Sequence, residues 1–373
     1  MNKHLRIFGC VLILLSGKLL GQVANSGMVN VYDSLEKGKV TVGGLVDVYY
    51  GYDLSNPINS DRPYAISSAR HNEVNVNLAY ADFRYINDYV RAHFVPGFGT
   101  YVNANYASEK GTLKNLLEAN VGVRLSKKKD IWVDAGVLPS PYTNESAISK
   151  DHLMYSRSFA PEYVPYYLSG VKLSLPLNSK LKSYWYLLNG WQMIQDVNNP
   201  LSLGTQFEYR PSNKWLLNWD TYVGDESSVV NPSFRTRYFS DLYMIYNPDG
   251  KWSATACAYL GYQSKRDSLN SQSSSKWWQM NAIIQYKFNR KAALAFRAEY
   301  FDDADGVQIV ANNNVNGFNS FSSGFCFNYK VNKNALFRLE SRSYYSEKNV
   351  YIDRKRNPSQ WAQLFVANLC VWF

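Results

Sequence analysis

The chain of 373 residues contains 30 Tyr, 18 Phe and 10 Trp, and aromatic residues make up 16% of it while charged residues make up 19%. This composition excludes intrinsic disorder, which is associated with few aromatic and many charged residues. After the first turns of the chain, no apolar run approaches the ~18–20 residues that cross a bilayer as a helix. The apolar residues are dispersed, as the two-residue alternation of β-strands would place them.

The N-terminus predicts export. Lys3 and Arg6 precede a short apolar run at residues 7–15. A basic start followed by an apolar core of roughly 7 to 15 residues is typical of a secretory signal peptide. We expect cleavage after Gly21 or Ala24.

Beyond this segment, apolar and polar residues alternate with a period of two. Every second residue from Trp278 to Phe288 is apolar, and the pattern resumes between Leu294 and Tyr300 after a short polar connection. Such a pair of runs predicts an antiparallel hairpin. The segments expected to be strands are 40–50, 74–78, 89–106, 117–125, 131–137, 166–175, 181–189, 201–210, 215–223, 234–246, 252–262, 278–288, 294–300, 321–329, 337–345 and 361–373.

The connections between these segments alternate in length. Short turns are expected at 87–88, 126–129, 176–180, 211–214, 247–250, 289–291 and 331–333. The interleaved connections are 51–72, 108–112, 139–165, 191–200, 225–233, 264–275, 302–315 and 346–360, of which only the second is brief. Outer-membrane barrels have short periplasmic turns and long extracellular loops. The pattern predicts an all-β, transmembrane, antiparallel up-and-down β-barrel of about 16 strands, with fourteen or eighteen left open.

Three domains follow from these patterns. Residues 1–21 are the expected signal peptide, residues 22–39 an N-terminal periplasmic segment and residues 40–373 the barrel. A soluble sandwich would show the same alternation. Aromatic residues at the strand ends favour a membrane barrel because they form an interfacial girdle, and the export signal agrees with it.

Charges inside the strands indicate which face points away from lipid, because a Lys or Arg facing the bilayer centre costs roughly 2 to 4 kcal/mol. In segment 234–246, for example, Arg235 and Arg237 lie on the face opposite Tyr238 and Leu242. A barrel of about sixteen strands is wide enough for a water-filled channel. The residues expected to line it are Asp47, Arg91, His93, Glu118, Arg124, Asp134, Lys172, Glu208, Arg210, Asp220, Arg235, Arg237, Asp241, Lys287, Arg297, Glu299, Arg338, Glu340 and Arg342.

The last strand ends on Phe373 and resembles the signal by which the barrel-assembly machinery recognises outer-membrane barrels, so Phe373 is the expected assembly signal. Segments 43–52, 76–82, 136–142 and 155–158 resemble the OmpL-like beta-barrel porin family. The resemblance implies an outer-membrane porin of a Gram-negative bacterium, exported through the periplasm and surrounded by outer-membrane lipid. It implies passive diffusion of small hydrophilic solutes and supplies no substrate-binding residues.

Charge in the lumen predicts a weak preference for anions, because basic residues modestly outnumber acidic ones and rings of Arg and Lys favour anions. The alternative is that these charges only solvate the lumen and pair with one another. The formal net charge of +10 does not indicate a nucleic-acid partner, since Lys and Arg are dispersed. No cofactor or metal is expected, and the oligomeric state is left open.

The longest connection, residues 139–165, is the third external loop in order, and in general porins that loop folds into the channel. We expect it to form the constriction; the alternative is a loop that caps the barrel from outside. Its charged residues are Glu145, Lys150, Asp151, His152, Arg157 and Glu162.

Two other classes of function are weighed against a diffusion channel. An enzyme is disfavoured because the mature chain holds only His71, His93 and His152, none beside a recognisable nucleophile motif. The second class is a narrower ligand-specific channel, for example for an oligosaccharide, or a structural or adhesive barrel. Aromatic residues in the lumen could stack on sugars or simply fill space. These are Tyr49, Trp132, Tyr222, Tyr243 and Tyr259.

Overall fold

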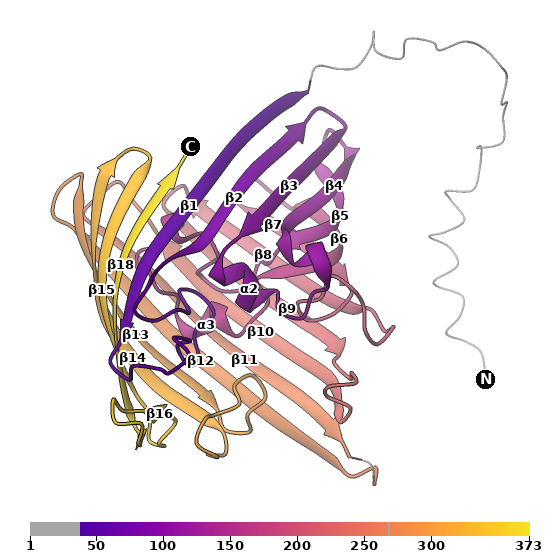
Figure 1. Ribbon diagram of the computed structural model, residues 1–373. Helices are drawn as coiled ribbons and strands as arrows, with labels where there is room; N and C mark the ends of the chain where they lie inside the picture. The colour runs from indigo at the N-terminus through magenta and orange to yellow at the C-terminus, as the bar shows by residue number, and fades with distance from the viewer. Residues whose placement is uncertain (1–37, 268) are drawn as a thin grey trace. The chain divides into compact units, whose positions relative to one another are not determined.

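The structure is a computed structural model that describes residues 38–373 except residue 268. Sixteen antiparallel strands in this part of the chain form one closed barrel (Figure 1). The strands are β1 (Lys39–Asp53), β2 (Val74–Ile86), β3 (Val90–Phe98), β4 (Leu116–Ser126), β5 (Ile131–Pro139), β6 (Tyr167–Pro176), β7 (Leu181–Leu188), β8 (Ser202–Ser212), β9 (Trp215–Asp225), β10 (Phe234–Tyr246), β11 (Trp252–Arg266), β12 (Gln272–Lys287), β13 (Ala292–Asp303), β14 (Phe318–Asn332), β15 (Ala335–Tyr345) and β18 (Trp361–Trp372). This confirms the predicted fold class. The expected signal peptide and most of the expected periplasmic segment lie outside the described residues.

Each strand pairs with its neighbours in sequence, and β18 closes the barrel by pairing with β1. At this seam Val46 lies opposite Val371. The backbone N–H of Phe373 donates to the carbonyl of Gly44 at 3.1 Å, and the N–H of Gly44 donates back at 3.2 Å. A closed barrel leaves no unpaired strand edge for hydrocarbon to surround.

The alternation seen in the sequence separates an outer from an inner face. On β12, Trp278 and Met280 are exposed on the outside, whereas Trp277 and Gln279 are buried inside. Aromatic pairs lie near the strand ends, as in Trp215 with Tyr246 at 4.4 Å between ring centroids. The outer face therefore has the apolar surface and aromatic ends of a barrel that meets lipid.

Short helices interrupt the barrel pattern inside the connections. They are α2 (Thr100–Asn105), α3 (Phe159–Glu162) and the 3₁₀ helices η3 (Gly111–Asn115) and η4 (Ser149–Asp151), and a two-stranded hairpin of β16 (Tyr351–Ile352) and β17 (Pro358–Ser359) lies between β15 and β18. No helix in the described ranges is both long and apolar enough to cross a membrane.

The prediction of one strand over residues 89–106 is wrong at its C-terminal half. Strand β3 shifts register between Val95 and Pro96 and ends at Phe98. Gly99 has φ 133°, a value that favours glycine, and the chain then turns into α2. Because a Cβ at Gly99 would collide with the carbonyl of Asn77, this glycine lets the chain leave the wall at that point.

Two predicted connections also change in length. The connection expected at 108–112 extends from Gly99 to η3. The connection expected at 264–275 is the brief one, because β11 continues to Arg266 and β12 begins at Gln272. The sequence did not indicate this extension, because the strand ends contain polar residues such as Ser273 and Ser274 and too few apolar residues to show alternation.

Candidate functional site

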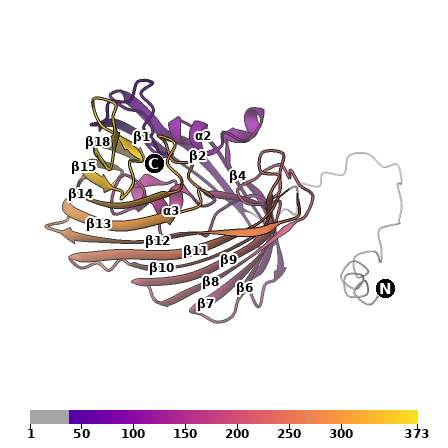
Figure 2. The ribbon, with the colours of Figure 1, turned by 90° about the horizontal axis from the view of Figure 1, so that it is seen from below.

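Residues 139–165, which we call the inward loop, lie inside the barrel. The loop leaves the wall at the end of β5 and returns to it at β6. Its backbone and side chains form hydrogen bonds with residues of β10, β11, β12, β13 and β15, which belong to a different part of the wall. Figure 2 shows α3, which belongs to this loop, within the ring of strands.

The first part of the inward loop is attached to β10, β11 and β12. The backbone N–H of Thr143 donates to Oδ2 of Asp241 at 2.6 Å. The side-chain amide of Asn144 donates to Thr255 Oγ1 at 3.0 Å and to Asn281 Oδ1 at 2.9 Å. These three hydrogen bonds give this part of the loop a defined position.

Two carboxylates of the wall hold the second part of the loop through its backbone N–H groups. Glu340 Oε2 accepts from Tyr155 at 2.8 Å and from Ser156 at 2.9 Å. Glu299 Oε2 accepts from the N–H of Phe159 at 2.6 Å, at the start of α3. Hydrogen bonds to ionised acceptors are about twice as strong as those between neutral groups.

Three arginines of the same strands bind the loop through its carbonyl groups. Arg297 donates to Ser156 O, Arg338 to Ser149 O and Arg342 to Arg157 O, each at 2.7 Å. Arg297 also lies 3.1 Å from Glu340 and 3.4 Å from Glu299, and Arg342 pairs with Glu299. We call these five residues of β13 and β15 the anchor cluster: Arg297, Glu299, Arg338, Glu340 and Arg342.

The anchor cluster points into the barrel but does not line open water. Arg297 and Arg338 are 0% exposed, and the other three members are at most 4% exposed. A buried charge is tolerated where it is paired and hydrogen-bonded, and the inward loop provides that environment. The sequence analysis placed these five residues among those that line the channel. In the structure they bind the inward loop instead.

The charged residues of the loop itself have different partners. Arg157 is buried and donates to the carbonyls of Ser146 and Ala147, at 2.8 and 2.5 Å, which closes the loop on itself. Glu162 accepts from the N–H of Ile66 at 2.6 Å, in the connection after β1. Lys150 and Asp151 pair with each other at 2.8 Å.

Glu145 and His152 form a buried pair within the loop. Burial opposes the charged form of Glu145, but the contact with His152 and the positive charge of Arg297 outweigh it and lower the pKa of Glu145 to about 2. Its Oε2 accepts from the N–H of Ser158 at 2.9 Å. Burial lowers the pKa of His152. The Nε2 of His152 accepts from the N–H of Ser146 at 3.1 Å, which requires this nitrogen to be unprotonated.

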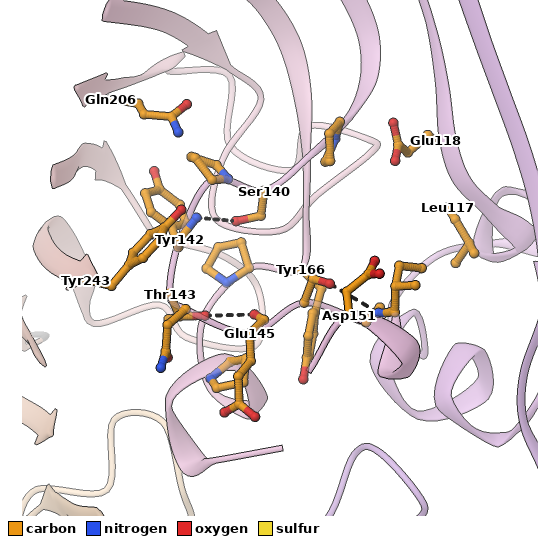
Figure 3. Close-up of a pocket in the computed structure, with 18 of the residues that line it drawn as sticks. Leu117, Glu118, Ser140, Tyr142, Thr143, Glu145, Asp151, Tyr166, Gln206 and Tyr243 are labelled. Carbon is orange, nitrogen blue, oxygen red and sulfur yellow. Dashed lines mark hydrogen bonds between the residues drawn. The ribbon is translucent and has the colours of Figure 1, made fainter. Parts of the chain in front are cut away.

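Two adjoining cavities remain inside the barrel. The inner cavity, of about 460 Å³, lies beside the inward loop and is shown in Figure 3. The vestibule, of about 490 Å³, reaches the rim where the short turns lie and includes Ile86 and Pro176. Residues shared by both linings are Glu118, Pro139, Lys172 and Tyr184. No member of the anchor cluster lines either of these two cavities.

The two cavities differ in charge. The vestibule is lined by five basic residues, Lys39, Arg84, Arg91, Lys172 and Lys182, and by three acidic residues, Glu118, Asp130 and Asp134. The inner cavity is lined by Glu118, Glu145, Asp151 and Glu208 with Lys172 and His152. Figure 3 shows Glu118 and Gln206 at opposite sides of the inner cavity.

Most charges of the vestibule are held in pairs. Arg91 binds Asp134 through two hydrogen bonds of 2.6 Å, and its guanidinium carbon lies 4.3 Å from the ring centre of Trp132. Arg124 lies over the same ring at 4.5 Å. His93 lies 2.7 Å from Glu118. Bidentate pairs and contacts with an aromatic face hold a guanidinium in a defined orientation.

Four more of the residues predicted to line the channel lie at three places. Asp47 is buried at the seam and accepts from Asn368 at 2.6 Å. Glu208 pairs with Arg210 at 2.9 Å. Arg237 is bound to Gln263 at 2.9 Å, and its guanidinium carbon lies 5.0 Å from the ring centre of Trp191.

Four further residues predicted to line the channel complete the comparison. Arg235 donates to the Pro232 carbonyl among the external loops, and Lys287 donates to the Pro248 carbonyl at a short turn. Asp220 and Asp241 lie opposite each other on β9 and β10.

Sequence reasoning missed two basic residues of the vestibule, Arg84 on β2 and Lys182 at the start of β7. Arg84 pairs with Asp82 of the same strand at 2.8 Å. The predicted second strand ended at residue 78, so the inward phase of Asp82 and Arg84 was not recognised. The sequence did contain a signal for this phase, because Asp82 and Arg84 alternate with the apolar residues Ala81 and Phe83.

The family model described as "Putative beta-barrel porin-2, OmpL-like" matches residues 39–373. No curated protein sequence matches the chain.

Three solved structures share the fold at low sequence identity. The outer membrane channel DcaP of Acinetobacter baumannii is 12% identical, with a TM-score of 0.62 over 90% of this chain and 97% of that one. OmpF of Salmonella typhi, solved with daunomycin, is 11% identical, with a TM-score of 0.59 over 90% and 98%. An anion-selective porin from Comamonas acidovorans is 10% identical, with a TM-score of 0.55 over 90% and 100%.

The family match extends over the whole barrel, and the solved structures agree with it in fold. The aromatic ends and apolar outer face are those of a protein surrounded by outer-membrane lipid. The chain therefore belongs to the OmpL-like beta-barrel porin-2 family and is a porin of a Gram-negative outer membrane.

Proposed function

We propose that this porin lets small hydrophilic solutes diffuse passively along the wall formed by β2 to β8. One observation carries the proposal: the inner cavity and the vestibule share lining residues on that side, while the inward loop is bound to β10 to β13 and to β15. A smaller cavity of about 220 Å³ lies among the external loops and is lined by Trp191, Glu226 and Arg237. In this proposal the inward loop is the constriction.

We expect the passage to favour anions weakly. The vestibule has more basic than acidic residues, and basic linings favour anions. The carboxylates of the inner cavity oppose this preference, and pairs such as Arg91 with Asp134 reduce the charge that a solute meets. The expected preference is therefore small, and the protein acts as a channel without catalysis.

The test is to reconstitute the purified protein in lipid. Liposome swelling should fall gradually as the sugar grows, and the reversal potential in a planar bilayer under a salt gradient should show anion preference. A protein that passes neither ions nor sugars would refute the channel, while cation preference would refute only the selectivity.

A second candidate, a narrower channel for one ligand such as an oligosaccharide, is favoured by the inner cavity. Seven tyrosines line it: Tyr101, Tyr106, Tyr142, Tyr166, Tyr184, Tyr186 and Tyr243. Aromatic rings beside carboxylates and amides can bind sugars. Saturable block of the ion current by an oligosaccharide would support this candidate; a graded size dependence without block would support diffusion.

Assembly is the remaining proposal. We expect the barrel-assembly machinery to recognise the last strand through Phe373, and we expect no nucleic-acid partner. The side chain of Phe373 is exposed while its backbone pairs with β1. The residue is thus available to a partner before the seam closes.

A further inference from the structure

Two aspartates on neighbouring strands face each other inside the barrel. Asp220 of β9 lies directly opposite Asp241 of β10 in the strand register. The two side chains are 0% and 1% exposed and share the inner face of the barrel. Directly opposed residues of an antiparallel pair bring their side chains within about 5 Å.

The four carboxyl oxygens are used unequally. Oδ2 of Asp241 accepts from the N–H of Thr143 in the inward loop at 2.6 Å, and Oδ2 of Asp220 accepts from the amide of Asn218. Oδ1 of each aspartate is buried and has no hydrogen-bond partner among the described residues. A buried oxygen that accepts no hydrogen bond is destabilising. Each aspartate therefore has one oxygen, Oδ1, that a hydrogen-bond donor would stabilise.

No positive charge compensates this pair. Within the described ranges, neither aspartate forms an ion pair with a Lys, Arg or His. The titratable groups that face it, from β7 to β11 and from the inward loop, are Tyr186, Glu208, Tyr222, Tyr243, Cys257, Tyr259 and Tyr142. These groups are neutral or acidic. Two ionised carboxylates there would repel each other, with no positively charged side chain paired to either one to offset the repulsion.

We propose that Asp220 and Asp241 share one proton, and that this proton keeps the start of the inward loop attached to β10. The proton lies between the two Oδ1 atoms, bonded to one carboxyl and donated to the other. The pair then carries a single negative charge, and Asp241 Oδ2 remains free to accept from Thr143. A carboxyl pair that shares a proton titrates as a unit.

Loss of the shared proton to water leaves two adjacent carboxylates. Repulsion then separates the side chains and displaces Asp241 from Thr143, while Asn144 still holds the next residue through Thr255 and Asn281. The expected consequence is a loosened loop start at alkaline pH. The inner cavity includes Thr143 and Asn144 in its lining, so this change would alter the passage.

Infrared spectroscopy of the purified barrel tests the shared proton without any transport measurement. At neutral pH the wild-type protein should show a protonated-carboxyl band that is lost in Asp220→Asn and in Asp241→Asn. The matched control is Asp249→Asn, an exposed carboxyl in the turn between β10 and β11. It should keep the band. If Asp220→Asn removes only a carboxylate signal, the pair is fully ionised and the proposal is overturned.

Ion current tests the effect on the loop, and this part rests on the proposed channel function. Current fluctuations of the wild-type protein should increase from neutral to alkaline pH. Asp220→Asn keeps a permanent donor beside Asp241, so its fluctuations should stay at the neutral level. If the fluctuations of Asp220→Asn increase at alkaline pH as much as those of the wild type, the link between the proton and the loop is refuted. A barrel that carries no current would refute the channel and leave the infrared result standing.

Discussion

Replacing Glu340 by Gln tests whether the anchor cluster holds the inward loop. Glu340 accepts from the backbone N–H groups of Tyr155 and Ser156 and from the Ser156 hydroxyl, and it lies 3.1 Å from Arg297. Glutamine keeps the shape and one acceptor oxygen but removes the charge. The NH₂ group of the glutamine cannot accept a hydrogen bond from the N–H groups of Tyr155 and Ser156.

The expected cost can be worked from these contacts. Removing one partner of a buried ion pair costs about 3–5 kcal/mol, because the remaining charge is left uncompensated. Arg297 keeps a second carboxylate, Glu299, at 3.4 Å, so we expect the lower end, about 3 kcal/mol. Since about 1.4 kcal/mol corresponds to a factor of ten, the balance between attached and detached loop should shift about a hundredfold.

Single-channel recording in planar bilayers measures this shift. Glu340→Gln should produce larger or more frequent current fluctuations than wild type. The matched control, Glu347→Gln, changes an exposed glutamate just beyond β15 and should behave like wild type. If the Glu340 variant folds, as judged by its heat-dependent gel mobility, and its current equals wild type, the anchoring role is refuted.

Four further predictions follow from the same geometry. Deleting residues 146–158 should raise the conductance because it removes the contacts that fill the barrel beside β13 and β15; an unchanged conductance would argue against a constriction. Arg91→Gln should move the reversal potential toward cations, since it removes a basic residue of the vestibule, and an exposed Arg354→Gln serves as control. Glu145 has its pKa lowered from 4.5 to about 2, so its contribution to the loop is complete above pH 4.5 and is lost as the pH falls through 2. Current fluctuations should therefore grow on acidification, less so in Glu145→Gln. Removing Phe373 should lower the yield of heat-modifiable barrel in outer membranes, whereas Phe288→Ala, at another strand end, should lower it less.

The architecture of the wall could be predicted from the sequence because lipid and lumen impose opposite demands on alternate residues. Segment 234–246 shows this directly: Arg237 and Asp241 lie inside, and Tyr238 and Leu242 lie outside. Where the outer residues are small or polar, the signal weakens. The ends of β11 and β12 were missed for this reason, and so was the inward phase of Asp82 and Arg84.

The arrangement inside the barrel could not be predicted in the same way. Alternation places Arg297 and Glu340 on the inner face, but whether they meet water or a loop depends on contacts between residues more than 140 positions apart, such as Arg297 with Ser156. Local patterns contain no information about such pairs. The helix α2 was missed because Val102, Ala104 and Tyr106 alternate with Asn103 and Asn105 as they would in a strand.

The filled half of the barrel changes which charges can act on a solute. Counting every inward charge gives weight to Arg338 and Arg342, yet both are buried against the inward loop. Arg342 pairs with Glu299, and Arg338 donates to carbonyl groups of the inward loop. If solutes pass as proposed, we expect selectivity to arise on the wall from β2 to β8, where Arg91 and Lys172 line the cavities together with Glu118 and Glu208. Substitutions there should change ion preference at constant loop position, whereas substitutions in the anchor cluster should change the loop first and ion preference only as a result.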